Sequence, residues 1–232
     1  MTWPPALGGV LGGVTVAAGV GAWGACHPSS QIFGRTVTRI PPSSSLALTF
    51  DDGPNPAATP QLLDLLDRHQ ARATFFLVGR WVRACQEIVR EIAARGHTIG
   101  NHTDTHPNLV WLSTRSIVAE LVRCQQSIEQ AAAEQPTLMR PPFGFRGPHL
   151  QAAVARSRLE TVVMWSVMGR DWSPRGKRRL VKRLARVGRG DILVLHDGSH
   201  RALGADRTET LRALEHWLPR WRDAGLNCVS LK

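Results

Sequence analysis

The stretch Thr49-Phe50-Asp51-Asp52-Gly53-Pro54-Asn55 decides how the chain is organised. It closes an apolar run that starts at Leu46, which predicts a buried strand, and Gly-Pro-Asn predicts the turn that ends this strand. The two carboxylates therefore stand where a strand gives way to a loop. Adjacent anions near a core repel each other, so we expect a bound cation or a shared proton to offset their cost. The plain alternative is a surface turn rich in Asp, Gly, Pro and Asn.

Length, composition and charge limit which kinds of protein and which partners the sequence suits. A length of 232 residues with 43% hydrophobic residues suits one substantial domain. The formal net charge of +11, with a basic cluster at 175–183, suits an anionic partner such as a wall polymer, lipid headgroups or nucleic acid, although a solvated basic face is an equal alternative. No nucleic-acid motif accompanies the charge, so we expect no nucleic-acid partner. The four cysteines form no CxxC pair, which argues against a cysteine zinc site, and we predict no essential disulfide.

The amino-terminal fifth of the sequence, residues 1–45, predicts a membrane anchor followed by a linker. Residues 1–34 carry no Asp, Glu, Lys or Arg, and residues 1–26 are apolar enough and about long enough for one transmembrane helix flanked by Trp3 and Trp23. Pro- and Ser-rich sequence at 27–45 predicts a linker, and the folded domain is expected over 46–232. A glycine-rich leader without structure is the alternative. The arginines that follow the segment would, by the positive-inside rule alone, keep the domain cytoplasmic.

From residue 46 onward, apolar runs alternate with amphipathic stretches. Seven runs with the length of strands separated by helices predict an α/β fold with a parallel sheet. We expect a closed or nearly closed barrel of (β/α)7 type, with its helices outside. The expected strands are 46–50, 73–78, 97–101, 138–140, 161–167, 191–195 and 227–231, and the expected helices are 59–69, 81–95, 113–133, 149–157, 174–187 and 208–224.

Polar side chains gather where the expected strands end, which is the catalytic face of such a barrel. They are Asp51, Asp52, His102, His106, Arg140, Asp171, His196 and Asp197. His102 and His106 are four residues apart, a spacing that can bring both rings onto one metal ion, although pairs that merely face solvent are common. Together with a carboxylate they would form a three-ligand site with open positions. Such a site suits Zn²⁺, and other divalent ions also fit it.

Five segments of the chain, in order, resemble the motifs of a known family. They are Thr49–Asn55, His102–His106, Arg140-Pro141-Pro142-Phe143-Gly144, Asp171-Trp172 and Leu193-Val194-Leu195-His196-Asp197-Gly198. The sequence resembles the polysaccharide deacetylases, the NodB-homology domains of carbohydrate esterase family four, from about Leu46 to its end. The resemblance implies a distorted (β/α) barrel and the hydrolysis of N-acetyl groups on an N-acetylated glycan, with release of acetate.

The resemblance also implies a metal centre and its base. Asp52, His102 and His106 would hold a divalent metal, with Zn²⁺ the expected ion. Asp51 would act as the general base toward the attacking water. Arg140 would pair with Asp51, orienting it and keeping it ionised.

The resemblance also implies roles for residues that would act on the oxyanion, the leaving amine and the acetyl group. The backbone N–H of Phe143, where many family members have Tyr, would help to stabilise the tetrahedral oxyanion. His196 would protonate the leaving amine, and Asp171 would fix the tautomer of that imidazole and raise its pKa. Trp172 and Leu195 would shape an apolar pocket for the acetyl methyl group.

We expect no catalytic role for five other histidines and for Asp197, and three alternatives to glycan deacetylation stay open. We interpret His69, His97, His149, His200 and His216 as structural or exposed, and Asp197 as a hydrogen-bonding residue at a strand end. The substrate could be peptidoglycan, a chitin-like oligomer or another envelope polysaccharide, and the resemblance favours a domain that faces the cell envelope. The alternatives are a hydrolase of a non-sugar amide or imide, an esterase, or a catalytically silent glycan-binding module. The retained catalytic set argues against the silent module.

Overall fold

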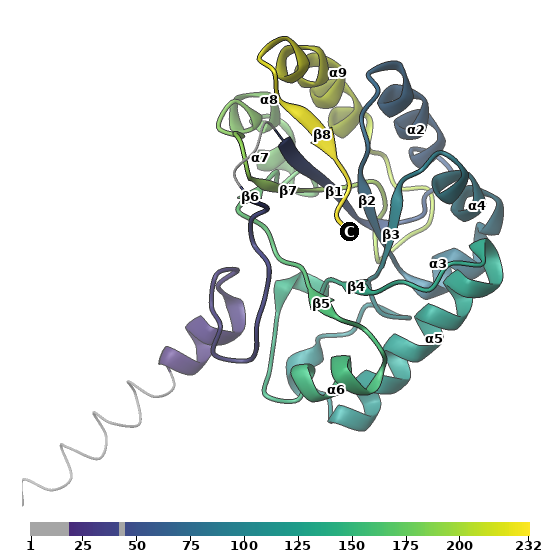
Figure 1. Ribbon diagram of the computed structural model, residues 1–232, viewed down its shortest axis with the longest axis vertical. Helices are drawn as coiled ribbons and strands as arrows, with labels where there is room; N and C mark the ends of the chain where they lie inside the picture. The colour runs from purple at the N-terminus through teal and green to yellow at the C-terminus, as the bar shows by residue number, and fades with distance from the viewer. Residues whose placement is uncertain (1–18, 42–44) are drawn as a thin grey trace, which may run out of the picture.

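The protein folds around one curled sheet of parallel strands, which the computed structural model describes over residues 19–41 and 45–232 (Figure 1). The strands follow the order β5-β4-β3-β2-β1-β7-β6, and β8 pairs with the start of β1. Among the described residues no ladder joins the two ends of this order, so the sheet is a half-barrel. The strands are β1 (Ser45–Gly53), β2 (Thr74–Leu77), β3 (Thr98–Asn101), β4 (Leu138–Met139), β5 (Thr161–Val162), β6 (Val167–Met168), β7 (Ile192–His196) and β8 (Asn227–Val229).

Helices cover the outer face of this sheet (Figure 1). Each longer helix buries an apolar stripe against the strands, as Leu62 and Leu66 of α2 and Leu214 and Leu218 of α9 do. The helices are α2 (Thr59–Arg68), α3 (Gly79–Ala84), α4 (Gln86–Ala94), α5 (Thr114–Ala132), α6 (Leu150–Arg156), α7 (Pro174–Lys177), α8 (Leu180–Leu184) and α9 (Thr208–Asp223), with the short 3₁₀ turns η1 (Leu109–Trp111) and η2 (Pro142–Gly144).

Strand β1 lies at the centre of the sheet, and this position explains why its residues are apolar on both faces. Leu46, Leu48 and Phe50 face the helices, Ala47 faces the inside of the half-barrel, and all four are fully buried. A parallel strand covered on both sides needs apolar residues at successive positions. The hydroxyl of Thr49 donates to the carbonyl of Leu193 at 2.8 Å, which satisfies the one polar side chain within this run.

The α/β class and the parallel strands are confirmed, but the barrel is more open than we expected. The run 161–167, predicted as one strand, forms β5 and β6 with a bend between them. Within the bend the N–H of Met164 donates to the carbonyl of Val37, whereas the N–H of Ser166 donates to that of Ile192 in β7. Neighbouring residues of this run therefore bond to different segments, which ends one strand and begins the next. The expected helices 81–95 and 174–187 are likewise each divided in two.

The stretch before β1 packs against the domain where the structure describes it. Residues 19–26 form a helix, and the buried guanidinium of Arg146 donates to the carbonyls of Ser30, His27 and Gly24 just beyond or at its end. Val37 bridges to Val163 in parallel, so part of the stretch predicted as a linker completes the edge beside β5. Residues 1–18 of the predicted membrane segment lie outside the described residues. Among the helices that the structure describes, none has the length and hydropathy needed to cross a membrane.

Candidate active site

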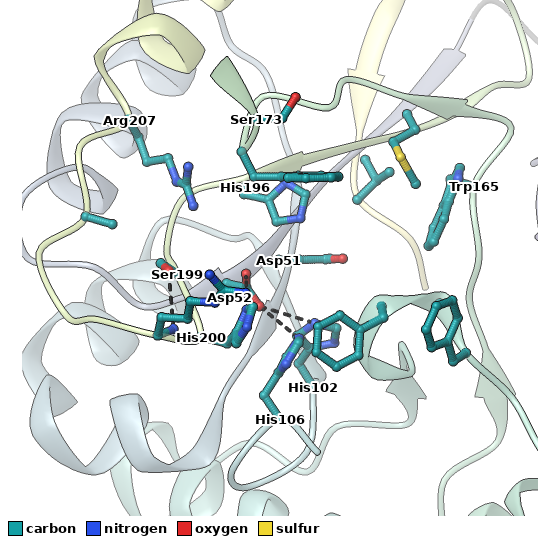
Figure 2. A pocket seen from close by; sticks show the side chains of 18 of the residues that line it. Asp51, Asp52, His102, His106, Trp165, Ser173, His196, Ser199, His200 and Arg207 are labelled. Atoms are coloured by element: carbon teal, nitrogen blue, oxygen red, sulfur yellow. Dashed lines mark hydrogen bonds and ion pairs between the residues drawn. The ribbon is translucent and has the colours of Figure 1, made fainter. Parts of the chain in front are cut away.

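A bulge at the end of β1 turns both adjacent carboxylates to one side. Asp51 pairs in register with Phe76 and Gly53 with Leu77, so Asp52 is the extra residue, with a φ of 70°. In a regular strand the two side chains would point to opposite faces. Here Asp51 and Asp52 both line one cavity of about 670 Å³ at the carboxyl ends of the strands (Figure 2).

Asp52, His102 and His106 form a compact set of metal-ligand atoms. Oδ1 of Asp52 lies 3.2 Å from Nε2 of His106 and 3.6 Å from Nε2 of His102, and the donor atoms of all three lie within 4.8 Å of one another. All three residues are buried. Among the described residues no donor bonds to Oδ1 of Asp52, and a buried carboxylate oxygen without a donor is costly unless a cation meets it. Two imidazoles and one carboxylate fit a divalent ion such as Zn²⁺.

The protonation states of these groups also fit a metal ion. Nδ1 of His102 lies 2.7 Å from the backbone carbonyl of Arg140 and donates to it, which leaves the Nε2 lone pair free to bind a metal. Burial lowers the pKa of His106 to about 4, so this ring is neutral near pH 7. Burial alone would raise the pKa of Asp52, but the imidazoles of His102, His106 and His200 that lie close around it hold that pKa well below its usual range. Metal ligands must be deprotonated in this way.

Asp51 is held by a fully buried arginine. Nη1 of Arg140 donates to Oδ1 of Asp51 at 2.7 Å and to the hydroxyl of Thr49 at 2.8 Å. The other guanidinium nitrogens donate to the carbonyls of Val163 and Met164, so they are also satisfied inside the protein. This geometry fixes one oxygen of Asp51 and leaves the other on the side of the cavity.

His196 lies across the cavity from the two histidine ligands (Figure 2), and it pairs with the fully buried Asp171. Nδ1 of His196 lies 2.8 Å from Oδ1 of Asp171, whose Oδ2 accepts from the backbone N–H of His196 and from the hydroxyl of Thr210. Burial alone would lower the pKa of His196, but the charge and hydrogen bond of Asp171 raise it to about 9. The ring therefore carries a proton near neutral pH, and its Nε2 can donate.

The predicted substrate-facing residues divide between the cavity and the core. Phe143 and Trp172 line the cavity and are 47% and 54% exposed, and Phe143 has a φ of 60°. Leu195 is fully buried in the core on the other face of β7 and does not line the cavity. Successive side chains of a strand alternate in direction, so its neighbour Val194 faces the cavity instead. The apolar wall that we expected from Leu195 is formed by Trp165, Met168 and Val194.

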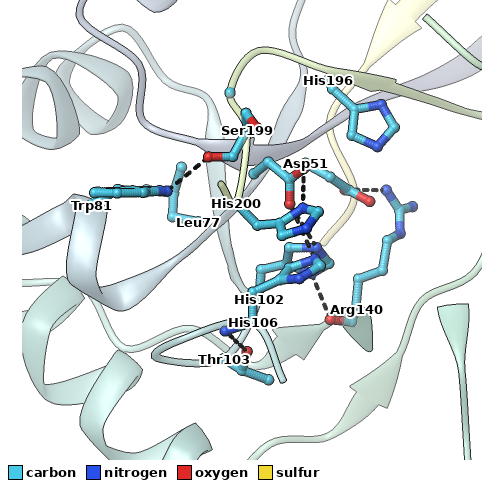
Figure 3. Close-up of polar contacts among 12 residues, drawn as sticks. Asp51, Leu77, Trp81, His102, Thr103, His106, Arg140, His196, Ser199 and His200 are labelled. Carbon is cyan, nitrogen blue, oxygen red and sulfur yellow. Dashed lines mark hydrogen bonds and ion pairs between the residues drawn. The ribbon is translucent and has the colours of Figure 1, made fainter. Parts of the chain in front are cut away.

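His200 belongs to the site, contrary to our interpretation of it as a structural or exposed residue. Its ring stacks on that of His106 with centroids 4.2 Å apart, and its Nδ1 lies 3.5 Å from Oδ2 of Asp52 (Figure 3). The sequence holds a signal for it, because His196 and His200 repeat the four-residue spacing of His102 and His106. His97, in contrast, is structural as expected, since its Nδ1 accepts from a backbone N–H in the core.

Comparisons with known proteins agree with this geometry. The family model described as polysaccharide deacetylase matches residues 38–162. The chitooligosaccharide deacetylase of a Bradyrhizobium species is 38% identical over 189 residues, which cover 78% of this chain and 86% of that protein. The chain belongs to the polysaccharide deacetylase family. It is therefore a metal-dependent hydrolase of carbohydrate esterase family four.

Solved structures of this family share the fold. A peptidoglycan N-acetylglucosamine deacetylase is 30% identical and aligns with a TM-score of 0.76 over 84% of this chain and 90% of its own. A family-four pseudoenzyme from Bacillus anthracis is 26% identical and aligns with a TM-score of 0.75 over 85% of this chain and 67% of its own. The fold therefore occurs in polysaccharide deacetylases with and without activity, and the side chains at the site must carry the argument about function.

Proposed function

We propose that this polysaccharide deacetylase hydrolyses the N-acetyl amide of a sugar within a chitooligosaccharide or a peptidoglycan strand, giving a free amine and acetate. One observation carries the proposal. Asp51 and His196 line the same cavity as the candidate metal ligands, and each is fixed by its own buried partner, Arg140 or Asp171. A base and an acid held beside a metal site form the set that amide hydrolysis by water requires.

The chain's own residues divide the reaction between them. A divalent ion, for which we propose Zn²⁺, would polarise the amide carbonyl and lower the pKa of water when bound to Asp52, His102 and His106. Asp51 takes a proton from the attacking water. The N–H of Phe143 donates to the oxygen on which negative charge develops. His196 delivers the proton on Nε2 to the leaving nitrogen as the carbon–nitrogen bond breaks, so the amine leaves neutral.

The apolar wall of the cavity favours an acetyl group as the part that is removed. Trp165, Met168 and Val194 offer only apolar contact beside the catalytic groups. A methyl group gains from such burial, whereas a charged or strongly polar acyl group would lose its hydration there. Hydrolysis of a non-sugar amide or imide, or of an ester, could use the same acid and base, and it stays an alternative until substrates are compared.

Acetate release from defined glycans tests the proposal. We would supply Zn²⁺ and compare N-acetylglucosamine oligomers with peptidoglycan fragments, and run the Asp51→Asn variant as the matched control. Wild-type release that Asp51→Asn abolishes, while the variant keeps its metal by elemental analysis, is the expected result. Equal activity of the two proteins would refute Asp51 as the base. A metal-loaded wild type that releases no acetate from any glycan would favour the non-sugar substrates or a silent binding module.

We also propose that residues 1–26 anchor the enzyme in a membrane with its catalytic domain facing the cell envelope. The apolar composition of this segment and the family resemblance support the proposal. Arg146 binds the carbonyls of Gly24, His27 and Ser30, so a deletion should stop before them to leave the fold intact. Removing residues 1–18 should move the protein from the membrane to the soluble fraction without loss of acetate release. A truncated protein that still sediments with membranes would refute the anchor.

A further inference from the structure

His200 has contacts on three sides within the active site. Besides its stacking on His106 and its approach to Asp52, its ring makes a T-shaped contact with that of Phe143, with centroids 5.3 Å apart. The side chain is 26% exposed and lines the cavity. The ring therefore covers part of the two candidate ligands Asp52 and His106 on the side of the cavity.

The loop that carries His200 is held by hydrogen bonds to its carbonyl groups. The indole N–H of Trp81 donates to the carbonyl of Ser199 at 3.0 Å, and the guanidinium of Arg80 donates to that of His200 itself. Arg207 donates to the carbonyl of Gly198 on the other side. Because the backbone is fixed at three successive residues, the imidazole of His200 is already in place before a metal ion binds. Little conformational entropy of this loop is then lost on binding.

The two oxygens of Asp52 have different surroundings. Oδ1 faces Nε2 of His102 and of His106 and accepts from no donor within the described part of the chain, whereas Oδ2 faces Nδ1 of His200. A carboxylate that binds a metal through one oxygen is usually oriented by a donor on the other. The donor atoms of Asp52, His102 and His106 form the compact ligand set, and His200 lies outside that set.

We propose that His200 is a positioning residue of the metal centre: its Nδ1–H donates to Oδ2 of Asp52 and so directs Oδ1 to the ion, while its ring covers His106. The inference rests on the metal-dependent activity proposed above but concerns ion binding rather than turnover. His200 would thereby raise the affinity of the site for its ion, without itself being a ligand.

Two substitutions separate the hydrogen bond from the stacking. His200→Phe keeps an aromatic ring over His106 and removes the donor. His200→Asn removes the ring but can place an amide N–H near the position of Nδ1. The dissociation constant for Zn²⁺ is measured by competition with a chelator, and the visible absorption of the Co²⁺-loaded protein reports the ligand set. Thermal unfolding of the metal-free variants controls for the fold.

We expect His200→Phe to weaken Zn²⁺ binding by about 10–100-fold, and His200→Asn to stay much closer to the wild type. The Co²⁺ spectrum should keep its intensity in both variants, because no ligand is lost. Unchanged Zn²⁺ affinity in His200→Phe would overturn the proposal. So would a Co²⁺ spectrum that changes equally in both variants, since this would make His200 a direct ligand. Ion binding is read without any substrate, so failure of the proposed deacetylation would not affect this test.

A second feature, independent of the first, is a basic face over α7 and α8. Residues 172–190 contain no acidic residue, and the flanking Asp171 and Asp191 are already paired with His196 and Arg39. None of the exposed cations of this stretch forms an ion pair among the described residues. They are Arg175, Arg178, Arg179, Lys182, Arg186 and Arg189.

This face begins at the rim of the active-site cavity. Trp172, Ser173 and Pro174 line the cavity, and Pro174 is the first residue of α7. Trp172 is half exposed and offers an aromatic surface of the kind on which a sugar ring packs. A polymer whose acetylated sugar enters the cavity and continues past Trp172 would therefore meet positive charge.

We infer that the substrate of this deacetylase is an anionic glycan, with carboxylate or phosphate groups near the acetylated sugar. This inference depends on the proposed deacetylation and specifies its substrate class. Charge complementarity would lower KM and make it depend on salt, and would leave the chemical step unchanged.

A charge-neutralising triple variant tests this inference. Arg178→Gln, Arg179→Gln and Lys182→Gln are combined, and KM is compared for peptidoglycan fragments that carry carboxylates and for neutral N-acetylglucosamine oligomers. The matched control is Arg115→Gln, Arg156→Gln and Arg158→Gln, which removes the same charge from exposed positions on and near α5 and α6.

We expect the α7–α8 variant to raise KM several-fold for the anionic fragments at low salt and to leave the neutral oligomers unchanged. An equal effect on neutral oligomers, or the same effect in the control, would refute the inference. So would unchanged KM together with lost binding to vesicles of anionic phospholipid, which would make this face a membrane contact. Turnover of neutral oligomers persists if only this inference fails, and is absent if the proposed function fails.

Discussion

Replacing Asp171 with Asn should change how the rate depends on pH. The carboxylate of Asp171 is the group that holds the pKa of His196 at about 9, well above its ordinary value of 6.5. A general acid works only while it is protonated, so the wild-type rate should fall as the pH rises through about 9. Without the negative charge, burial is the dominant influence on His196, and the pKa should lie at or below 6.5.

The size of the effect follows from the two pKa values. At pH 7 about 99% of a group with a pKa of 9 is protonated, against about 24% of a group with a pKa of 6.5. The same arithmetic makes the ratio of wild-type to variant kcat/KM roughly 1.3 at pH 6, 4 at pH 7 and 30 at pH 8 from protonation alone. Any loss of orientation adds a factor that does not depend on pH. The growth of the ratio between pH 6 and pH 8, by about twentyfold, is therefore the diagnostic quantity.

The assay is acetate release at subsaturating glycan between pH 6 and pH 9, with a fixed excess of Zn²⁺. Thr210→Val is the control, since it removes a hydroxyl that donates to Oδ2 of Asp171 at 2.8 Å but keeps the carboxylate charge. The pH at which the rate of Thr210→Val falls on the alkaline side should stay near that of the wild type. A ratio for Asp171→Asn that is constant with pH would refute the reasoning, because His196 would then not act as an acid whose pKa is set by Asp171.

Two further predictions concern the metal centre and the buried ion pair. His106→Ala should lower the zinc content of the purified protein by elemental analysis, since one of three ligands is lost; undiminished content would exclude His106 from the set. Arg140→Met should lower the free energy of unfolding by about 3–5 kcal/mol, because Asp51 is 5% exposed and would keep a buried charge without a partner. Adding Asp51→Asn to that variant should restore part of the loss in denaturant unfolding, and a purely additive double variant would contradict the pairing.

The positions of most strands and helices could be predicted because hydrophobic periodicity records burial directly. The run at 46–50 and the stretch at 208–224 are examples, and both appear with boundaries within a few residues as β1 and α9. Closure of the barrel could not be predicted in this way. The bend in 161–167 depends on backbone partners at Val37 and Ile192, which are distant in sequence and leave no pattern in the run itself.

At the site, residue types at strand ends were predictable, but side-chain directions were not. The bulge at Asp52 turns two neighbouring carboxylates to the same side, and no rule of alternation predicts it. Alternation within β7, in contrast, could have placed Leu195 in the core, because His196 was already expected to face the cavity. His200 was missed because its four-residue spacing from His196 was the one sequence signal for it, and a loop after a strand has no periodicity that places a side chain.

The short helix α3 explains how two distant loops come to hold one metal centre. The N–H groups at the start of a helix have no partner within the helix. Here those of Gly79 and Arg80 donate to the carbonyls of Thr103 and Asp104, in the loop between the two histidine ligands. The side chain of Arg80, together with that of Trp81, holds the loop of His200 from the other side. A Cβ at Gly79 would lie 3.0 Å from Cα of Cys124 and 3.2 Å from Cα of Asp104, so the close approach of these backbones favours glycine at the helix start. The helix thus fixes one loop through its own backbone N–H groups and the other through two side chains, and in both cases the acceptors are backbone carbonyls. The sequence pattern placed the start of this helix at residue 81 because it records only the apolar face.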